Sequence, residues 1–154
     1  MRRVLGFAVT ALVVLVLPLP LAQAASASQR DGVTIETQKP FGPSPGTFSA
    51  SGAFSDSGTF ANTRIVFSAV GAPTFGVTHL TALFEGSLGT FTLSANIKET
   101  LTADPNVLAD NGTWVIVDGT GAYTKLHGQG EVTGTADDNQ GLINRTYAGT
   151  AHFD

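Results

Sequence analysis

The chain has 154 residues, about the length of one domain, and with 42% hydrophobic and 13% charged residues it is too apolar to be disordered. Its formal net charge of -4 argues against nucleic-acid or anionic-membrane binding through basic charge. It has no cysteine, which excludes disulfides, thiolate nucleophiles and cysteine-ligated zinc.

Residues 1–24 have the pattern of a cleaved export signal. Two arginines precede the almost wholly apolar stretch 4–21, and Ala-Gln-Ala at 22–24 supplies the small residues that signal peptidase accepts. The alternative is a membrane anchor, because such a stretch can just span a bilayer. Two prolines near its end and the lack of a following basic cluster argue against an anchor. We therefore expect a secreted, extracellular protein that has no membrane contact after cleavage.

Residues 25–46 are expected to form a flexible leader that contains one short strand, 33–38. The segment 25–31 is small and polar, and 39–46 carries three prolines, which interrupt regular strands. The folded domain is then 47–154, to which the strand 33–38 contributes.

From there on, apolar residues recur with a period of two between glycine-bearing turns, which is typical of strands and not of helices. Phe91, Leu93 and Ile97, for example, alternate with threonine, serine and asparagine. The predicted strands are 33–38, 47–53, 61–70, 76–85, 90–101, 113–117, 126–136 and 142–153.

Short turns and one apolar face per strand predict an all-β, antiparallel meander. Eight such strands avoid exposed edges by closing into a barrel, and a β-sandwich is the alternative. The interior of an eight-stranded barrel holds packed side chains or one small ligand. We expect 102–112 to be the longest internal loop and to cap one mouth of the barrel.

The most distinctive stretch is the glycine-rich segment 118–130. A strand follows it, whereas a dinucleotide-binding fingerprint must open a helix, so nucleotide binding is not expected. Gly119 and Gly121 are expected to form a tight turn that places Tyr123 over the end of the barrel, with Gly128 as a further structural glycine.

Gly119, Thr120, Gly121, Tyr123 and Gly128 also resemble the glycine-threonine-glycine and aromatic segment of the allene oxide cyclase and dirigent superfamily, in particular its small secreted bacterial members. The resemblance is concentrated in 112–135. It implies an eight-stranded antiparallel barrel with an apolar cavity, often in a trimer or dimer. Some members of that superfamily guide cyclisation or radical coupling of lipid-like or phenolic ligands.

Two charged residues fall on the apolar parity of their strands. Arg145 shares its parity with Ile143 and Tyr147, and Glu99 shares its parity with Phe91 and the residues that alternate with it. Because a buried, unpaired charge costs several kcal/mol, either the two meet inside or each is exposed at a strand end. As an internal pair, Arg145 would stabilise a ligand's negative charge and Glu99 would act as acid or base.

The three histidines lack metal-binding spacing, so no metal site is expected. His79 shares parity with Val77 and Leu83 and is a third catalytic candidate beside Glu99 and Arg145. His127 and His152 lie on polar parities and are expected to be exposed. The acidic turn at 137–139 lacks the regular spacing of a calcium-binding loop.

Three functions remain open. The first is a secreted module that binds a small hydrophobic or phenolic ligand; the second is a cofactor-free cyclase or isomerase; the third is a structural extracellular protein with a filled barrel. The same assignment of inward parity predicts apolar patches outside and a possible homo-oligomer, with Leu80, Phe84, Val115 and Val117 on the outer surface. The predicted ligand-binding residues are Phe91, Leu93, Trp114, Ile116, Arg145 and Tyr147.

Overall fold

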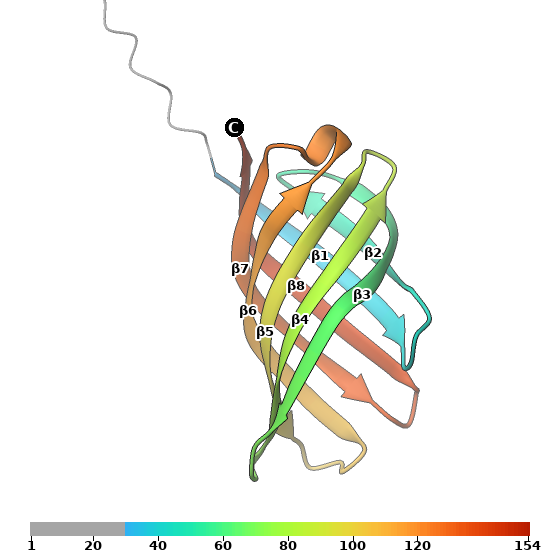
Figure 1. Ribbon diagram of the computed structural model, residues 1–154. Helices are drawn as coiled ribbons and strands as arrows, with labels where there is room; N and C mark the ends of the chain where they lie inside the picture. Colours follow the sequence, from blue (N-terminus) through green and yellow to red (C-terminus); the bar gives the residue numbers. More distant parts are fainter. Residues whose placement is uncertain (1–29) are drawn as a thin grey trace, which may run out of the picture.

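The computed structural model describes residues 30–154; the predicted export signal and the first part of the leader lie outside this range. The described chain forms eight strands and one short 3-10 helix (Figure 1). The elements are β1 Asp31–Pro40, β2 Gly46–Gly52, β3 Asp56–Ala69, β4 Thr74–Gly86, β5 Thr90–Leu101, β6 Val107–Gly119, η1 Gly121–Tyr123, β7 Leu126–Asp137 and β8 Leu142–Phe153.

These strands form a closed antiparallel barrel. Each strand pairs with the next one along the chain, and β1 pairs with β8 along its whole length, Asp31–Pro40. The all-β meander that closes into a barrel is therefore confirmed, and the β-sandwich alternative is wrong. The first strand, β1, starts at Asp31, two residues before the predicted strand 33–38.

The contact between β2 and β3 is the shortest seam of the barrel. Proline residues at 43 and 45 delay the start of β2, which is only seven residues long. It pairs with β3 through Gly46–Ala50 and Asp56–Phe60. Beyond this seam, residues 61–69 of β3 pair with β4 alone, and the β3–β4 turn, in green in Figure 1, projects further than the β1–β2 turn. We call residues 61–69 the open edge of β3.

Several predicted boundaries are wrong. β1 continues through Pro40, β3 begins at Asp56, and β6 begins at Val107, so the predicted loop 102–112 shrinks to 102–106. Asp110 and Gly112 look like turn residues in the sequence, but both belong to β6. A Cβ atom at Gly112 would lie 1.9 Å from the carbonyl oxygen of Asn96, so this strand position accepts only glycine.

One end of the barrel interior is filled with aromatic rings. Phe84 stacks on Phe91 at 4.7 Å between ring centroids and on Phe60 at 5.0 Å, and Phe54 meets Tyr123 edge to face at 5.3 Å. We call these residues, together with Phe48, the aromatic end. They are at most 7% exposed, so this half of the interior is a packed core.

The inward face of β4 is opposite to the predicted one. Leu80 and Phe84 are buried at 2% and 0% exposure, so they face the interior and not the outside, while His79, next to Leu80, is exposed. Val115 and Val117 of β6 do face outward, as predicted, and are exposed. The error arose because Val77 and Leu83 are also apolar, so both faces of this strand look apolar in the sequence.

The turn at η1 closes the aromatic end as the sequence indicated. Gly121 adopts φ +60, and Tyr123 is 1% exposed. The Tyr123 hydroxyl donates to Asp56 Oδ2 at 2.7 Å, and Asp56 Oδ1 also accepts from Ser87 Oγ at 2.7 Å and from the backbone N–H of Ser57 at 2.8 Å. This Asp56 cluster joins the start of β3 to the β4–β5 turn and to η1.

The same cluster shifts two pKa values. Burial alone would raise the pKa of Asp56, but its hydrogen bonds from Ser87, Tyr123 and backbone N–H groups outweigh burial and hold the pKa well below its usual range. Burial, reinforced by the bond to the Asp56 carboxylate, raises the pKa of Tyr123. Asp56 is therefore a carboxylate, and Tyr123 a hydrogen-bond donor, at neutral pH.

Candidate functional site

The opposite half of the interior carries charged and polar side chains. Glu99 on β5 is in register with Asp110 on β6, Asp110 with Gly134 on β7, and Gly134 with Arg145 on β8. Residues in register on neighbouring strands point to the same face of the sheet. We call the inward-facing group of Lys39, Thr78, Glu99, Asp110 and Arg145 the charged end.

Arg145 and Asp110 form a buried ion pair. Arg145 Nε donates to Asp110 Oδ2 at 2.7 Å, and the side chains are 10% and 0% exposed. The strand between them contributes Gly134, where a Cβ atom would lie 2.8 Å from Arg145 Cγ and 2.2 Å from the carbonyl oxygen of Asn144. A glycine at this position leaves Arg145 the space to reach across β7.

Charge attraction decides the ionisation of Arg145. Burial would lower its pKa, but attraction to the Asp110 carboxylate and the hydrogen bond that Arg145 donates to it outweigh burial, so the pKa of Arg145 is raised above its ordinary value. Burial raises the pKa of the neighbouring Tyr147 phenol, while Arg145 partly opposes that shift. The guanidinium therefore stays charged inside the barrel at neutral pH.

Asp110 has a second oxygen that is not satisfied. Its Oδ1 is buried and has no hydrogen-bond partner, a property shared within residues 30–154 only by Asn62 Oδ1. Both Asp110 and Asn62 lie on inward-facing positions of their strands. Leaving a buried acceptor unpaired costs roughly 1–3 kcal/mol, so these two oxygens are energetically unfavourable as they stand.

The remaining charges of this end are partly satisfied. Thr78 Oγ1 donates to Glu99 Oε1 at 2.7 Å, and Lys39 Nζ donates to the carbonyl oxygens of Gly42 at 2.6 Å and Pro40 at 3.1 Å. Lys39 is only 6% exposed. Burial, followed by repulsion from Arg145, lowers the pKa of Lys39. Sequence reasoning missed Lys39 because the prolines that follow it indicated a loop.

Apolar side chains of β3 face the same interior but remain open to solvent. Ile65 is in register with the buried Leu80, and Phe67 with the buried Thr78, so both point inward. They are nevertheless 56% and 46% exposed, because no strand covers them beyond the β2–β3 seam. The charged end is thus bordered by an accessible apolar surface.

The structure separates the three catalytic candidates. Glu99 and Arg145 both face inward at the charged end and neither is exposed, but Arg145 pairs with Asp110, whereas Glu99 accepts from Thr78. His79 is exposed on the outer face and hydrogen-bonds Asn96 there, so its predicted inward orientation is wrong. Asp110 was missed because it fell in a predicted loop. The alternation of Trp114 and Ile116, continued backward through the glycine at 112, would have found it.

Most of the predicted ligand-binding residues are parts of the packed interior. Trp114 Nε1 donates to the carbonyl oxygen of Glu131 at 3.0 Å, and its ring lies 6.4 Å from that of Tyr147. Only Arg145 among the predicted set is above 5% exposure. The buried residues are Phe91, Leu93, Trp114, Ile116 and Tyr147.

A histidine pair lies on the outside near the chain's C-terminal residues. His127 and His152 stack with their ring centroids 5.2 Å apart, and their Nε2 atoms lie 3.1 and 3.5 Å from the carboxylate of Asp154. His127 is exposed as predicted, whereas His152 is largely covered. Within residues 30–154, no group of three or more His, Asp or Glu side chains is placed to hold a metal ion.

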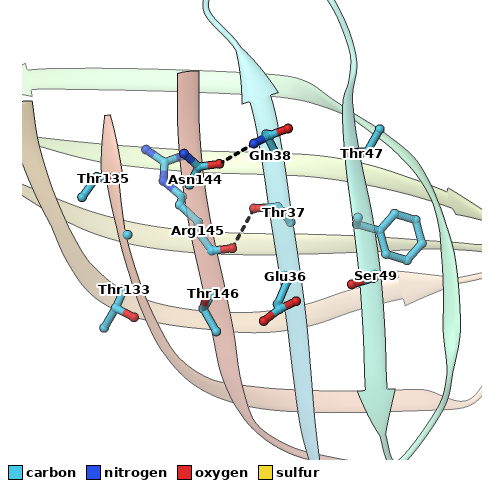
Figure 2. A pocket seen from close by; sticks show the side chains of 12 residues that line it. Glu36, Thr37, Gln38, Thr47, Ser49, Thr133, Thr135, Asn144, Arg145 and Thr146 are labelled. Atoms are coloured by element: carbon cyan, nitrogen blue, oxygen red, sulfur yellow. Dashed lines mark hydrogen bonds between the residues drawn. The ribbon is translucent and has the colours of Figure 1, made fainter. Parts of the chain in front are cut away.

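A polar groove of about 610 Å³ lies over the outer face of β7, β8, β1 and β2. Figure 2 shows Gln38 and Asn144 joined across β1 and β8, by a hydrogen bond of 3.1 Å from Gln38 Nε2 to Asn144 Oδ1. Its outward-facing side chains are hydroxyl, amide and carboxylate groups, and its one aromatic residue, Phe48, belongs to the core. None of the outward-facing side chains that line the groove is aromatic or aliphatic.

None of the helical structure in residues 30–154 is long and apolar enough to cross a membrane. The closed eight-stranded barrel is the fold that the resemblance to the allene oxide cyclase and dirigent superfamily implies, while membership stays a prediction. Comparison of the chain with models of protein families, with curated proteins and with solved structures found no match.

Proposed function

We propose that the protein is a secreted binding module that takes up a small, apolar or aromatic molecule at the charged end of its barrel. The observation that carries this proposal is the buried Asp110 Oδ1, which lacks a partner although its other oxygen is paired with Arg145. A ligand that donates a hydrogen bond there would relieve the cost of that unpaired acceptor.

The surroundings favour an amphipathic ligand. Phe67 packs its ring over Gly76, where a Cβ atom would lie 2.2 Å from it, and the next strand places Glu99 in register with Gly76. An apolar surface therefore continues directly into the charged end. A ligand with an aromatic body and a hydroxyl group would cover Phe67 and reach Asp110. The predicted phenolic ligand is therefore kept, but its proposed site moves from the packed residues around Phe91 to the charged end.

Binding also decides whether acid–base chemistry is available. Two carboxyl groups and one guanidinium converge at the charged end, the residue types that move protons and stabilise negative charge. Such chemistry requires a substrate held against Asp110 or Glu99. A binding measurement is therefore the first test for both the binding module and the enzyme alternative.

The test uses two probes of almost equal shape, 1-naphthol and 1-methoxynaphthalene, and follows the fluorescence of each during titration with the protein. Only 1-naphthol can donate to Asp110 Oδ1. We expect it to bind at least about tenfold more tightly, since one hydrogen bond to a buried charged acceptor is worth roughly 1.5–3 kcal/mol. Equal affinities, or no saturable binding of either probe, would overturn the proposal.

Two substitutions locate the site. Asp110→Asn presents an amide donor where the wild type presents an acceptor, so we expect the preference for 1-naphthol to disappear. Phe67→Ser removes apolar contact and should weaken both probes together. Val117→Ser is the matched control, because Val117 is 55% exposed on the outer face and should leave both affinities unchanged.

A further inference from the structure

The open edge of β3 has backbone groups that no strand of the described chain satisfies. The N–H of Val70 donates to the carbonyl oxygen of Phe75 at 3.0 Å, which fixes the alternation of hydrogen bonds along the β3–β4 pair. By that alternation Ser68 and Val66 also bond to β4. The N–H and C=O groups of Ile65, Phe67 and Ala69 therefore point away from β4, on the side where β2 is absent.

This edge also lacks the usual protection against pairing. Strand edges that stay single are normally short or carry lysine, proline or several charges. Residues 61–69 contain one charge, Arg64, and no proline. Ile65, Val66 and Phe67 are 56%, 40% and 46% exposed, so apolar side chains are accessible on both faces of the strand.

We propose that the open edge of β3 pairs with the same edge of a second copy of this chain, forming an antiparallel junction between two barrels. A second copy supplies an edge of identical length and composition, and antiparallel self-pairing has the two-fold symmetry of the commonest homodimers. A strand from an unrelated protein would need a matching pattern that nothing in this structure specifies.

The hydrogen-bonding pattern of the open edge of β3 allows it to pair with the same edge of a second copy. In a register centred on Val66, Ile65 of one chain lies opposite Phe67 of the other. The backbone groups of both residues point into the junction, so each such pair exchanges two hydrogen bonds. The same register sets Arg64 opposite Ser68 and keeps the two arginines apart. It also covers apolar side chains that are exposed in the single barrel.

Sedimentation velocity of the folded, exported chain, from micromolar to near-millimolar concentration, tests the proposal. We expect a concentration-dependent dimer for the wild type. Ile65→Lys places a charge at the centre of the junction and should weaken the dimer by at least about tenfold. Val115→Lys is the control, because Val115 is an apolar residue of similar exposure, 43%, that is in register with Ser94 on β5 and with Gln129 on β7.

Ala69→Pro provides a second variant, which removes an N–H that faces the junction and none that bonds to β4. It should also weaken the dimer, and its far-ultraviolet circular dichroism should match the wild type. A wild type that stays monomeric, forms trimers, or dimerises equally well with Ile65→Lys and Ala69→Pro would overturn the proposal. Because Ala69→Pro leaves the charged end intact, 1-naphthol titration of that variant separates this proposal from the proposed binding function.

Discussion

The aromatic end and the charged end are two halves of one barrel interior, which share β4 and β5 but are stabilised in different ways. At the aromatic end, stacked rings such as Phe84 and Phe91 exclude water completely. At the charged end, Arg145 and Asp110 are also buried, yet one carboxylate oxygen stays unpaired and the adjoining Ile65 is open to solvent. The comparison shows that the first half is closed by ring packing, while the second half keeps a buried hydrogen-bond acceptor without a partner.

The largest expected effect is at the aromatic end. Phe91→Ala removes a ring that contacts four other aromatic side chains, and should lower the free energy of unfolding by about 3–5 kcal/mol, measured by urea denaturation. Phe153→Ala, at a residue that is 40% exposed, is the control and should cost far less. Equal losses at the two positions would contradict the division of the interior.

Breaking the ion pair should cost about 3 kcal/mol. Arg145→Met leaves the Asp110 carboxylate buried without its cation. The double variant Asp110→Leu, Arg145→Met removes both charges and should recover most of the lost stability in the same urea titrations. A double variant as unstable as the single one would mean that the two charges are themselves required for folding.

The Asp56 cluster should contribute about 2 kcal/mol, because Asp56→Ala deprives Tyr123, Ser87 and backbone N–H groups of their common acceptor. The lowered pKa of Asp56 gives this contribution a pH dependence. It is fully present above the unfolded-state pKa, about 4, and is lost as pH falls toward the lower folded-state pKa. Unfolding curves of wild type and variant should therefore converge in acid; a constant difference would contradict this assignment.

The smallest effect is expected at His79. Since this side chain is exposed on the outer face, His79→Ala should change the free energy of unfolding by less than about 0.5 kcal/mol and leave 1-naphthol binding unaltered. Glu99→Gln is the contrasting variant, because Glu99 faces the charged end and accepts from Thr78. Weaker 1-naphthol binding in His79→Ala would place the site on the outer face.

Much of the fold was predictable because the period of two is clear wherever one face of a strand meets water. The period of two did not identify the inward face of β4, because both Val77 and Leu80 are apolar. It also did not locate the start of β6, because the inward-facing residues there are polar. Parity alone placed Glu99 and Arg145 on inward faces. It could not reveal that Gly134 lets Arg145 reach Asp110, because that contact depends on the register of three strands.

The brevity of β2 has a dynamic consequence. Every other junction of the cylinder is longer, so the Gly46–Ala50 contact is where transient separation of the wall takes the least free energy. Backbone amides there should exchange with deuterium sooner than those between β4 and β5. A pair of prolines in a surface loop thus sets where the wall of the barrel first opens.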